Sequence, residues 1–121
     1  MNVAAVALMS IALSVAAQFA MKAGMSGPGT KAALNEPFAL GTVWTVLSNG
    51  YVVGGFLLYG IGAVFWLRVL GAWDVSKAYP MVGLGFALTA IIGSMIGEQV
   101  TPSRAVGVAL ICAGVYLTGR S

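Results

Sequence analysis

Residues 2–23 read NVAAVALMSIALSVAAQFAMKA, an apolar run in which Lys22 is the one charged side chain. At 1.5 Å of rise per residue, an α-helix of this length crosses the ~30 Å hydrocarbon core of a bilayer. Polar side chains recur at every fourth position of the run, at Ser10, Ser14, Gln18 and Lys22. Because polar groups are penalised in contact with lipid, we predict that this stripe faces a protein interior, a partner helix or a wet cavity.

The composition of the whole chain indicates an integral membrane protein. Its 121 residues are 60% hydrophobic and 7% charged, and the mean hydropathy of +0.96 lies outside the range of soluble domains. Apolar runs predict four spans, at about residues 2–23, 51–71, 78–97 and 104–119, which fill nearly all of the chain. We therefore expect an all-α integral membrane fold, in which residues 1–121 form one small bundle of four transmembrane helices that dimerises.

The breaks between the spans carry turn and capping signals. Residues 26–30 (SGPGT) end the first helix and open a long connection. The apolar residues of this connection either lie along the membrane surface, or Trp44 marks an early start of the second helix; they are Phe38, Leu40, Val43, Trp44 and Val46. Thr101 followed by Pro102 is typical of a helix N-cap and first helical position.

The start of the third span is open to two interpretations. Asp74 and Ser76 are both candidate N-caps. Pro80 then lies in or near the first turn of the helix, or it kinks the span. Either position places Tyr79 near a bend or an entrance.

The basic residues are divided evenly between the two ends of the predicted bundle. The side of the N-terminus holds Arg68, Lys77 and Arg120, and the opposite side holds Lys22, Lys31 and Arg104. This balance specifies no orientation and permits insertion both ways, and hence an antiparallel homodimer, unless a partner chain or the N-terminal amine fixes the topology. Basic residues scattered in this way form no nucleic-acid surface, so we expect no nucleic-acid partner.

The fourth span contains small residues that allow helices to approach closely. Gly107 and Gly114 lie two helical turns apart, and Ala113 adjoins the second glycine. Small residues drive helix contact in lipid, so this face is either a dimer seam or an intrachain packing surface. Cys112 in the same span is the only cysteine of the chain, which excludes an intrachain disulfide and favours a packing role.

Several motifs together resemble the four-helix branch of the drug/metabolite transporter superfamily. These are residues 13–18 (LSVAAQ) with Lys22, residues 78–81 (AYPM), the Gly97-Glu98 pair, and the run from Gly107 to Gly114. The first two most resemble the small subunits proposed to flip aminoarabinose-phosphoundecaprenol, and more generally the EamA-type domain. The fourth span is equally similar to small multidrug resistance proteins. The resemblance implies a multi-pass protein of the bacterial inner membrane that pairs with a second copy or with a related four-helix chain.

One position departs from the small multidrug resistance pattern. Where that family places its membrane-embedded glutamate, this chain has Ser14, which cannot bind cations and protons in alternation. An anionic amphiphile fits the residues better: Lys22, Arg68 or Lys77 would bind a phosphate, while Ser14 and Gln18 would bind sugar hydroxyls. The alternative is that Lys22 and Arg68 are snorkelling anchors and that Lys77 is an exposed partner of Asp74. Tyr79 joins the substrate-binding set, and Glu98 is either a loop residue or a coupling residue.

We therefore expect a transporter that moves a lipid-linked sugar of the polyprenyl-phosphate type, or a similar amphiphile, between leaflets by alternating access. Its first and third helices would line the pathway. An exporter of small amphiphilic compounds and a non-transporting subunit that docks a glycosyltransferase through Trp44, Trp66 and the glycine faces are the alternatives. The chain has no His, no paired carboxylates and no cluster of metal ligands. We therefore expect no catalytic residues, no metal and no cofactor, and a protein that is not an enzyme.

Overall fold

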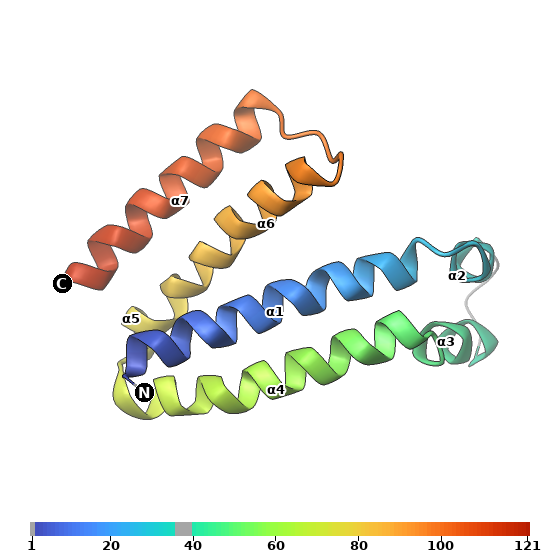
Figure 1. Cartoon of the computed structure of the whole chain (residues 1–121), viewed down its shortest axis with the longest axis horizontal. Helices are drawn as coiled ribbons and strands as arrows, with labels where there is room; N and C mark the ends of the chain where they lie inside the picture. The colour runs from blue at the N-terminus through green and yellow to red at the C-terminus, as the bar shows by residue number, and fades with distance from the viewer. Residues whose placement is uncertain (1, 36–39) are drawn as a thin grey trace.

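The computed structural model describes residues 2–35 and 40–121, and within these ranges the chain is helical apart from short turns (Figure 1). In these ranges four helices are long and apolar enough to cross a membrane: α1 (Val3–Met25), α4 (Gly50–Ala72), the broken helix Val75–Met95 and α7 (Pro102–Arg120). The expectation of an all-helical fold with four candidate spans is confirmed. Dimerisation stays a prediction.

Helix α1 begins and ends at polar capping residues. The side-chain oxygen of Asn2 accepts a hydrogen bond from the Ala5 amide at 2.7 Å, which satisfies one of the free donors of the first turn. At the other end, the hydroxyl and the amide of Ser26 donate to Lys22 O at 2.8 and 3.0 Å. The helix therefore continues two residues beyond the predicted end at residue 23 and stops at the Gly27-Pro28 break.

The long connection forms two short helices, α2 (Pro28–Leu34) and α3 (Leu40–Leu47). Trp44 is 74% exposed on α3, and α4 begins separately after Asn49, whose side chain accepts from the amides of Tyr51 and Val52. The early start of the second helix at Trp44 is therefore wrong, because Asn49 caps a new helix. Phe38 lies outside the described residues.

Helices α1 and α4 pack antiparallel along most of their lengths (Figure 1). Gly55 permits this approach, because a Cβ there would clash with Met21 Cγ and lie 2.9 Å from Ala17 O. Gly62 does the same farther along α4, where a Cβ would lie 3.2 Å from Ser10 O. Small residues at such positions let helices associate where lipid supplies no hydrophobic drive. The buried core of Val6, Ala7, Val69 and Ala78 lies at the end of the pair that holds the N-terminus.

The third span is broken at Pro80. One helical turn, α5 (Val75–Ala78), leads into a 3₁₀ segment, η1 (Tyr79–Val82), before α6 (Gly83–Met95) begins. Pro80 thus lies beyond the first turn and kinks the span, since it has no amide hydrogen to continue an α-helical ladder. Asp74 occupies the N-cap position, but its side chain makes no capping hydrogen bond. Ser76 lies inside α5 and is not the N-cap, because the Asp74 carbonyl already accepts the amides of Lys77 and Ala78.

Helices α6 and α7 form an antiparallel hairpin. The Thr101 hydroxyl accepts the Arg104 amide at 3.1 Å, and Pro102 is the first residue of α7, as predicted. The close contact between the two helices is at Gly83, where a Cβ would lie 2.8 Å from Ile111 Cγ2. The hairpin splays away from the α1–α4 pair toward the end opposite the two termini (Figure 1).

Candidate functional site

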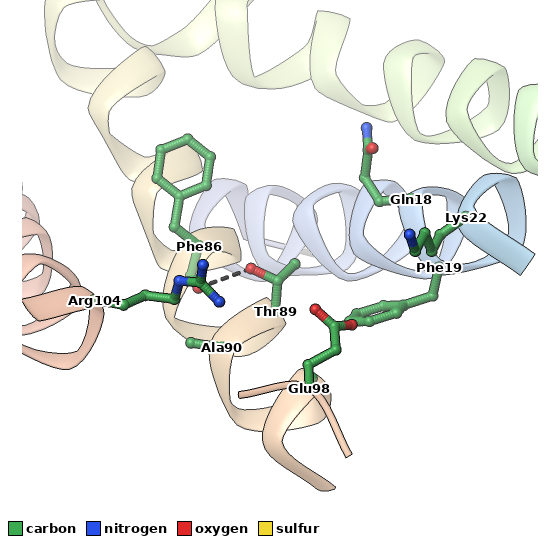
Figure 2. A pocket seen from close by; sticks show the side chains of 9 residues that line it. Gln18, Phe19, Lys22, Phe86, Thr89, Ala90, Glu98 and Arg104 are labelled. Carbon is green, nitrogen blue, oxygen red and sulfur yellow. Dashed lines mark hydrogen bonds between the residues drawn. The ribbon is translucent and has the colours of Figure 1, made fainter. Parts of the chain in front are cut away.

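An open groove of about 470 Å³ lies where the α6–α7 hairpin separates from α1 (Figure 2). Its walls come from α1, from α6, from the loop after α6 and from the start of α7. The lining residues are Gln18, Phe19, Lys22, Phe86, Thr89, Ala90, Gly93, Glu98 and Arg104. Residues of the first and third spans and of the start of the fourth thus line the groove, which contains two cations, one carboxylate, one amide, one hydroxyl and two phenylalanine rings. That the first and third helices line a substrate pathway stays a prediction.

The polar stripe of α1 does not keep to one face. Four residues of an α-helix turn through about 400°, so each step of the stripe drifts by about 40° around the axis. Ser10 is buried against α4, where its hydroxyl donates to Gly62 O at 2.6 Å. Gln18 and Lys22, two and three steps later, line the groove. The first residue of the stripe, Ser10, therefore packs against α4, whereas the last two, Gln18 and Lys22, line the groove.

Ser14 and Tyr79 lie together in a second cavity of about 200 Å³, between α1, α4 and the break in the third span. The Ser14 hydroxyl donates to Ile11 O in its own helix at 2.8 Å. Ser10, Tyr59 and Trp66 also line this cavity. In the sequence, Trp66 was considered only as a docking residue and Tyr59 was not singled out. Their spacing of seven residues, which places both on one face of α4, is the signal that sequence reasoning passed over.

Glu98 is positioned by the way α6 ends. Gly97 adopts a φ of +97°, a conformation that favours glycine, and the Glu98 amide donates to Gly93 O at 2.9 Å. Together with the Gly97 amide on Ser94 O at 3.4 Å, this is the Schellman arrangement that closes a helix. It turns the chain back so that the Glu98 side chain lies against the last turn of α6 and enters the groove (Figure 2).

Arg104 enters the groove from the first turn of α7. One of its guanidinium nitrogens, Nη1, donates to Gln99 O at 2.7 Å, which fixes the side chain across the loop. The remaining guanidinium donors can serve a ligand, since the group carries five N–H bonds. Arg104 was recognised in the sequence only as a basic residue on the side of Lys22. Thr89, Phe19 and Phe86 were missed altogether, because isolated residues of these types are common in membrane helices.

Arg68 and Lys77 lie apart from the groove, toward the end of the molecule that holds the termini. The Lys77 ammonium lies over the Trp73 ring, 4.7 Å from its centroid, which replaces the expected pairing with Asp74 by a cation–π contact. Arg68 is exposed near the end of α4 and lines none of the cavities described above. Of the three alternative phosphate ligands, Lys22 thus lies in the groove and Arg68 and Lys77 lie at the other end of the molecule, while Arg104 is the second cation of the groove.

The small residues of α7 make few contacts within the chain. A Cβ added at Gly107 or Gly114 would meet nothing within 4 Å, and Ala113 is exposed. Among the described residues of α7, Val115 alone is buried. Gly107 and Gly114 therefore do not bring α7 close to α6, a role that Gly83 performs, and the dimer seam stays a prediction.

Comparison with known proteins gives several relatives. ArnF of Sodalis glossinidius, named as a probable 4-amino-4-deoxy-L-arabinose-phosphoundecaprenol flippase subunit, is 35% identical over 122 residues, which cover 92% of this chain and 85% of that protein. ArnE of Pseudomonas savastanoi pv. phaseolicola, named as a probable subunit of the same flippase, is 45% identical over 62 residues, 50% of this chain and 54% of that protein. The chain thus spans about half the length of this ArnE relative.

An uncharacterised protein of Sinorhizobium fredii, y4nH, is 35% identical over 69% of this chain and 73% of its own length. No family model and no solved structure matches the chain. The names of the ArnE and ArnF relatives describe transport subunits rather than enzymes, and they occur as two kinds of subunit. Since the ArnF relative aligns with nearly the whole chain, the chain belongs to the family of the aminoarabinose-phosphoundecaprenol flippase subunits ArnE and ArnF.

Proposed function

We propose that the chain is a transport subunit that moves a polyprenyl-phosphate-linked sugar between the leaflets of the bacterial inner membrane. The observation that carries this proposal is the groove between α1 and α6, where Lys22 and Arg104 face the same space of about 470 Å³. Two cations in one groove suit a phosphate, which accepts charge-assisted hydrogen bonds from ammonium and guanidinium groups. The names of the relatives support the same class of substrate.

The polar and apolar groups of the groove suit the two parts of such a lipid. Gln18 offers both a donor and an acceptor to sugar hydroxyls. Phe19 and Phe86 form apolar walls that a prenyl chain can contact. Since the groove is open, the prenyl tail stays in lipid while the polar headgroup moves through the protein. The four helices therefore need to enclose only the headgroup.

The polar stripe of α1 contributes residues to both the groove and the second cavity. Lys22 and Gln18 line the first, and Ser14 lines the second together with Tyr79. We place the headgroup path along this stripe, with phosphate binding at Lys22 and Arg104 and a neutral sugar station near Ser14 and Tyr79. Arg68 and Lys77 then serve as anchors or as the receiving site at the other membrane surface.

A second four-helix chain completes the pathway in this proposal. Helix α7 exposes Val106, Leu110, Leu117 and Gly114, and a Cβ added at Gly107 would meet nothing within 4 Å. Close contact through small residues is the usual means by which such helices associate. Two kinds of subunit among the relatives support a heterodimer, and the even distribution of basic residues supports a homodimer.

Flipping in reconstituted vesicles tests the proposal. The double variant Lys22→Gln, Arg104→Gln removes both cations of the groove and should reduce the flipping rate of a labelled prenyl-phosphate sugar at least tenfold, with insertion into the vesicles unchanged. Lys31→Gln is the matched control, because Lys31 is an exposed cation of α2 outside the groove. Equal flipping by the double variant and the control would refute the proposed role. Transport of lipophilic cations without lipid flipping would favour the exporter.

A further inference from the structure

Glu98 is an acidic side chain in a groove whose other charged residues are basic. Both its backbone amide and its side chain lie against the last turn of α6. The Glu98 amide closes the Schellman arrangement on Gly93 O, and the carboxylate lies over Gly93, where an added Cβ would come within 3.4 Å of Glu98 Cδ and Oε1. A glycine at residue 93 thus leaves room for the carboxylate beside the last turn of α6, inside the groove.

The Glu98 carboxylate makes no ion pair with any residue in the part of the chain that the structure describes. Arg104 is turned instead to Gln99 O, at 2.7 Å, and Figure 2 shows the Arg104 guanidinium and the Glu98 carboxylate on either side of Thr89. The carboxylate also lies beside the carbonyl end of α6, where the helix dipole favours positive charge and disfavours negative charge. This corner of the groove therefore favours a cation.

Thr89 strengthens the acceptor character of the same corner. Its hydroxyl hydrogen is donated to Phe86 O at 2.8 Å (Figure 2), so toward a ligand in the groove its oxygen can act only as an acceptor. An ionised carboxylate likewise only accepts. A ligand group that binds both must donate several hydrogen bonds and carry positive charge, as a primary ammonium does.

We infer that Glu98, assisted by Thr89, binds a protonated amino group on the sugar headgroup, while Arg104 and Lys22 bind its phosphate. The groove then selects an amphiphile that carries both charges over one that carries the phosphate alone. This inference rests on the proposed function and names the residue that distinguishes an amino sugar from a neutral sugar.

Binding of two matched lipids tests the inference. The probes are a short prenyl phosphate that carries an amino sugar and the same lipid with a hydroxyl in place of the amine, each titrated against the full-length protein in nanodiscs. An accessible ammonium–carboxylate pair is worth at most about 1 kcal/mol, so the wild-type protein should prefer the amino lipid about fivefold. Glu98→Gln should reduce this ratio to about one without changing the affinity for the hydroxyl lipid.

Three further variants sharpen the comparison. Asp74→Asn removes an acidic group outside the groove and should keep the fivefold preference. Glu98→Asp keeps the charge on a shorter side chain, and Thr89→Val removes the second acceptor, so both should give intermediate ratios. Circular dichroism measures whether each variant is folded. If Glu98→Gln does not fold, Glu98→Asp and Thr89→Val still test the inference.

The outcomes separate the inference from the function on which it rests. A preference that survives Glu98→Gln overturns the inference. An equal change in affinity for both lipids also overturns it, because Glu98 would then not distinguish the amine from the hydroxyl. Equal binding of both lipids by the wild-type protein overturns the inference and leaves the flippase intact. Binding of neither lipid overturns both.

Discussion

Replacing Gly55 by Ala tests how closely α1 and α4 pack. A Cβ at this position would clash with Met21 Cγ and would lie 2.9 Å from Ala17 O and 3.2 Å from the Met21 amide nitrogen. Two of these three neighbours are backbone atoms of α1, so a side-chain rotation cannot relieve the contact. The helices must separate, and the close packing that holds them together in lipid is reduced.

The adjacent Gly54 supplies a matched control. A Cβ there would meet nothing within 4 Å. Both substitutions gain about 1 kcal/mol of helix propensity, since glycine is a poor helix former. Only Gly55→Ala adds the overpacking cost of about 1–3 kcal/mol, so it should be less stable than Gly54→Ala by this amount.

The free energy of unfolding is measurable by circular dichroism as the protein is titrated with a denaturing detergent in mixed micelles. We expect Gly54→Ala to be at least as stable as the wild-type protein and Gly55→Ala to unfold at lower detergent fractions. If the two variants unfold together, α1 and α4 are not in the close contact described above. The division of the polar stripe between packing and groove would then lose its basis.

Three other substitutions have defined effects. Ser10→Ala removes the buried hydrogen bond to Gly62 O and should lower the unfolding free energy by about 0.6–1.7 kcal/mol in the same titration. Thr101→Ala removes the cap of α7 and should cost about 1 kcal/mol, and Thr101→Ser should recover most of it. Gly97→Ala forces a side chain into a φ of +97°, which should cost about 1–2 kcal/mol and, by displacing Glu98, reduce the preference for the amino lipid. Unchanged stability of Ser10→Ala, a Thr101→Ser protein as weak as Thr101→Ala, or a full lipid preference in Gly97→Ala would each contradict the corresponding assignment.

Local signals predicted the helices better than they predicted the contacts. The apolar runs and the Thr101-Pro102 pair act through residues that are close together in the sequence. The number of candidate spans and the start of α7 were therefore predicted correctly. The effect of Pro80 depended on where the third helix begins. The Asp74 carbonyl accepts two amides and so starts the helix there, whereas side-chain preferences for capping fit both Asp74 and Ser76 and do not choose between them.

The groove depended on contacts between segments far apart in the sequence. Gln18 and Lys22 were found because a polar residue in an apolar helix is costly and therefore conspicuous. Arg104 was not, because a cation at the end of a span is equally explained by anchoring. That Arg104 lines the same groove as Lys22 follows from the packing of the α6–α7 hairpin beside α1, which no local signal specifies.

The same geometry determines which charges can move relative to one another. Lys22 lies on α1, which Gly55 and Gly62 fix against α4, whereas Glu98 and Arg104 lie on the α6–α7 hairpin. The hairpin joins the α1–α4 pair through the 3₁₀ segment Tyr79–Val82, where the regular α-helical hydrogen bonds are interrupted. Any rocking of the hairpin about this break therefore changes the distance from Lys22 to both Arg104 and Glu98 together. Under the proposed function, a phosphate bound by both Lys22 and Arg104 would draw the hairpin toward α1, and its departure would release it, so the placement of these two cations would couple substrate binding to the position of the hairpin.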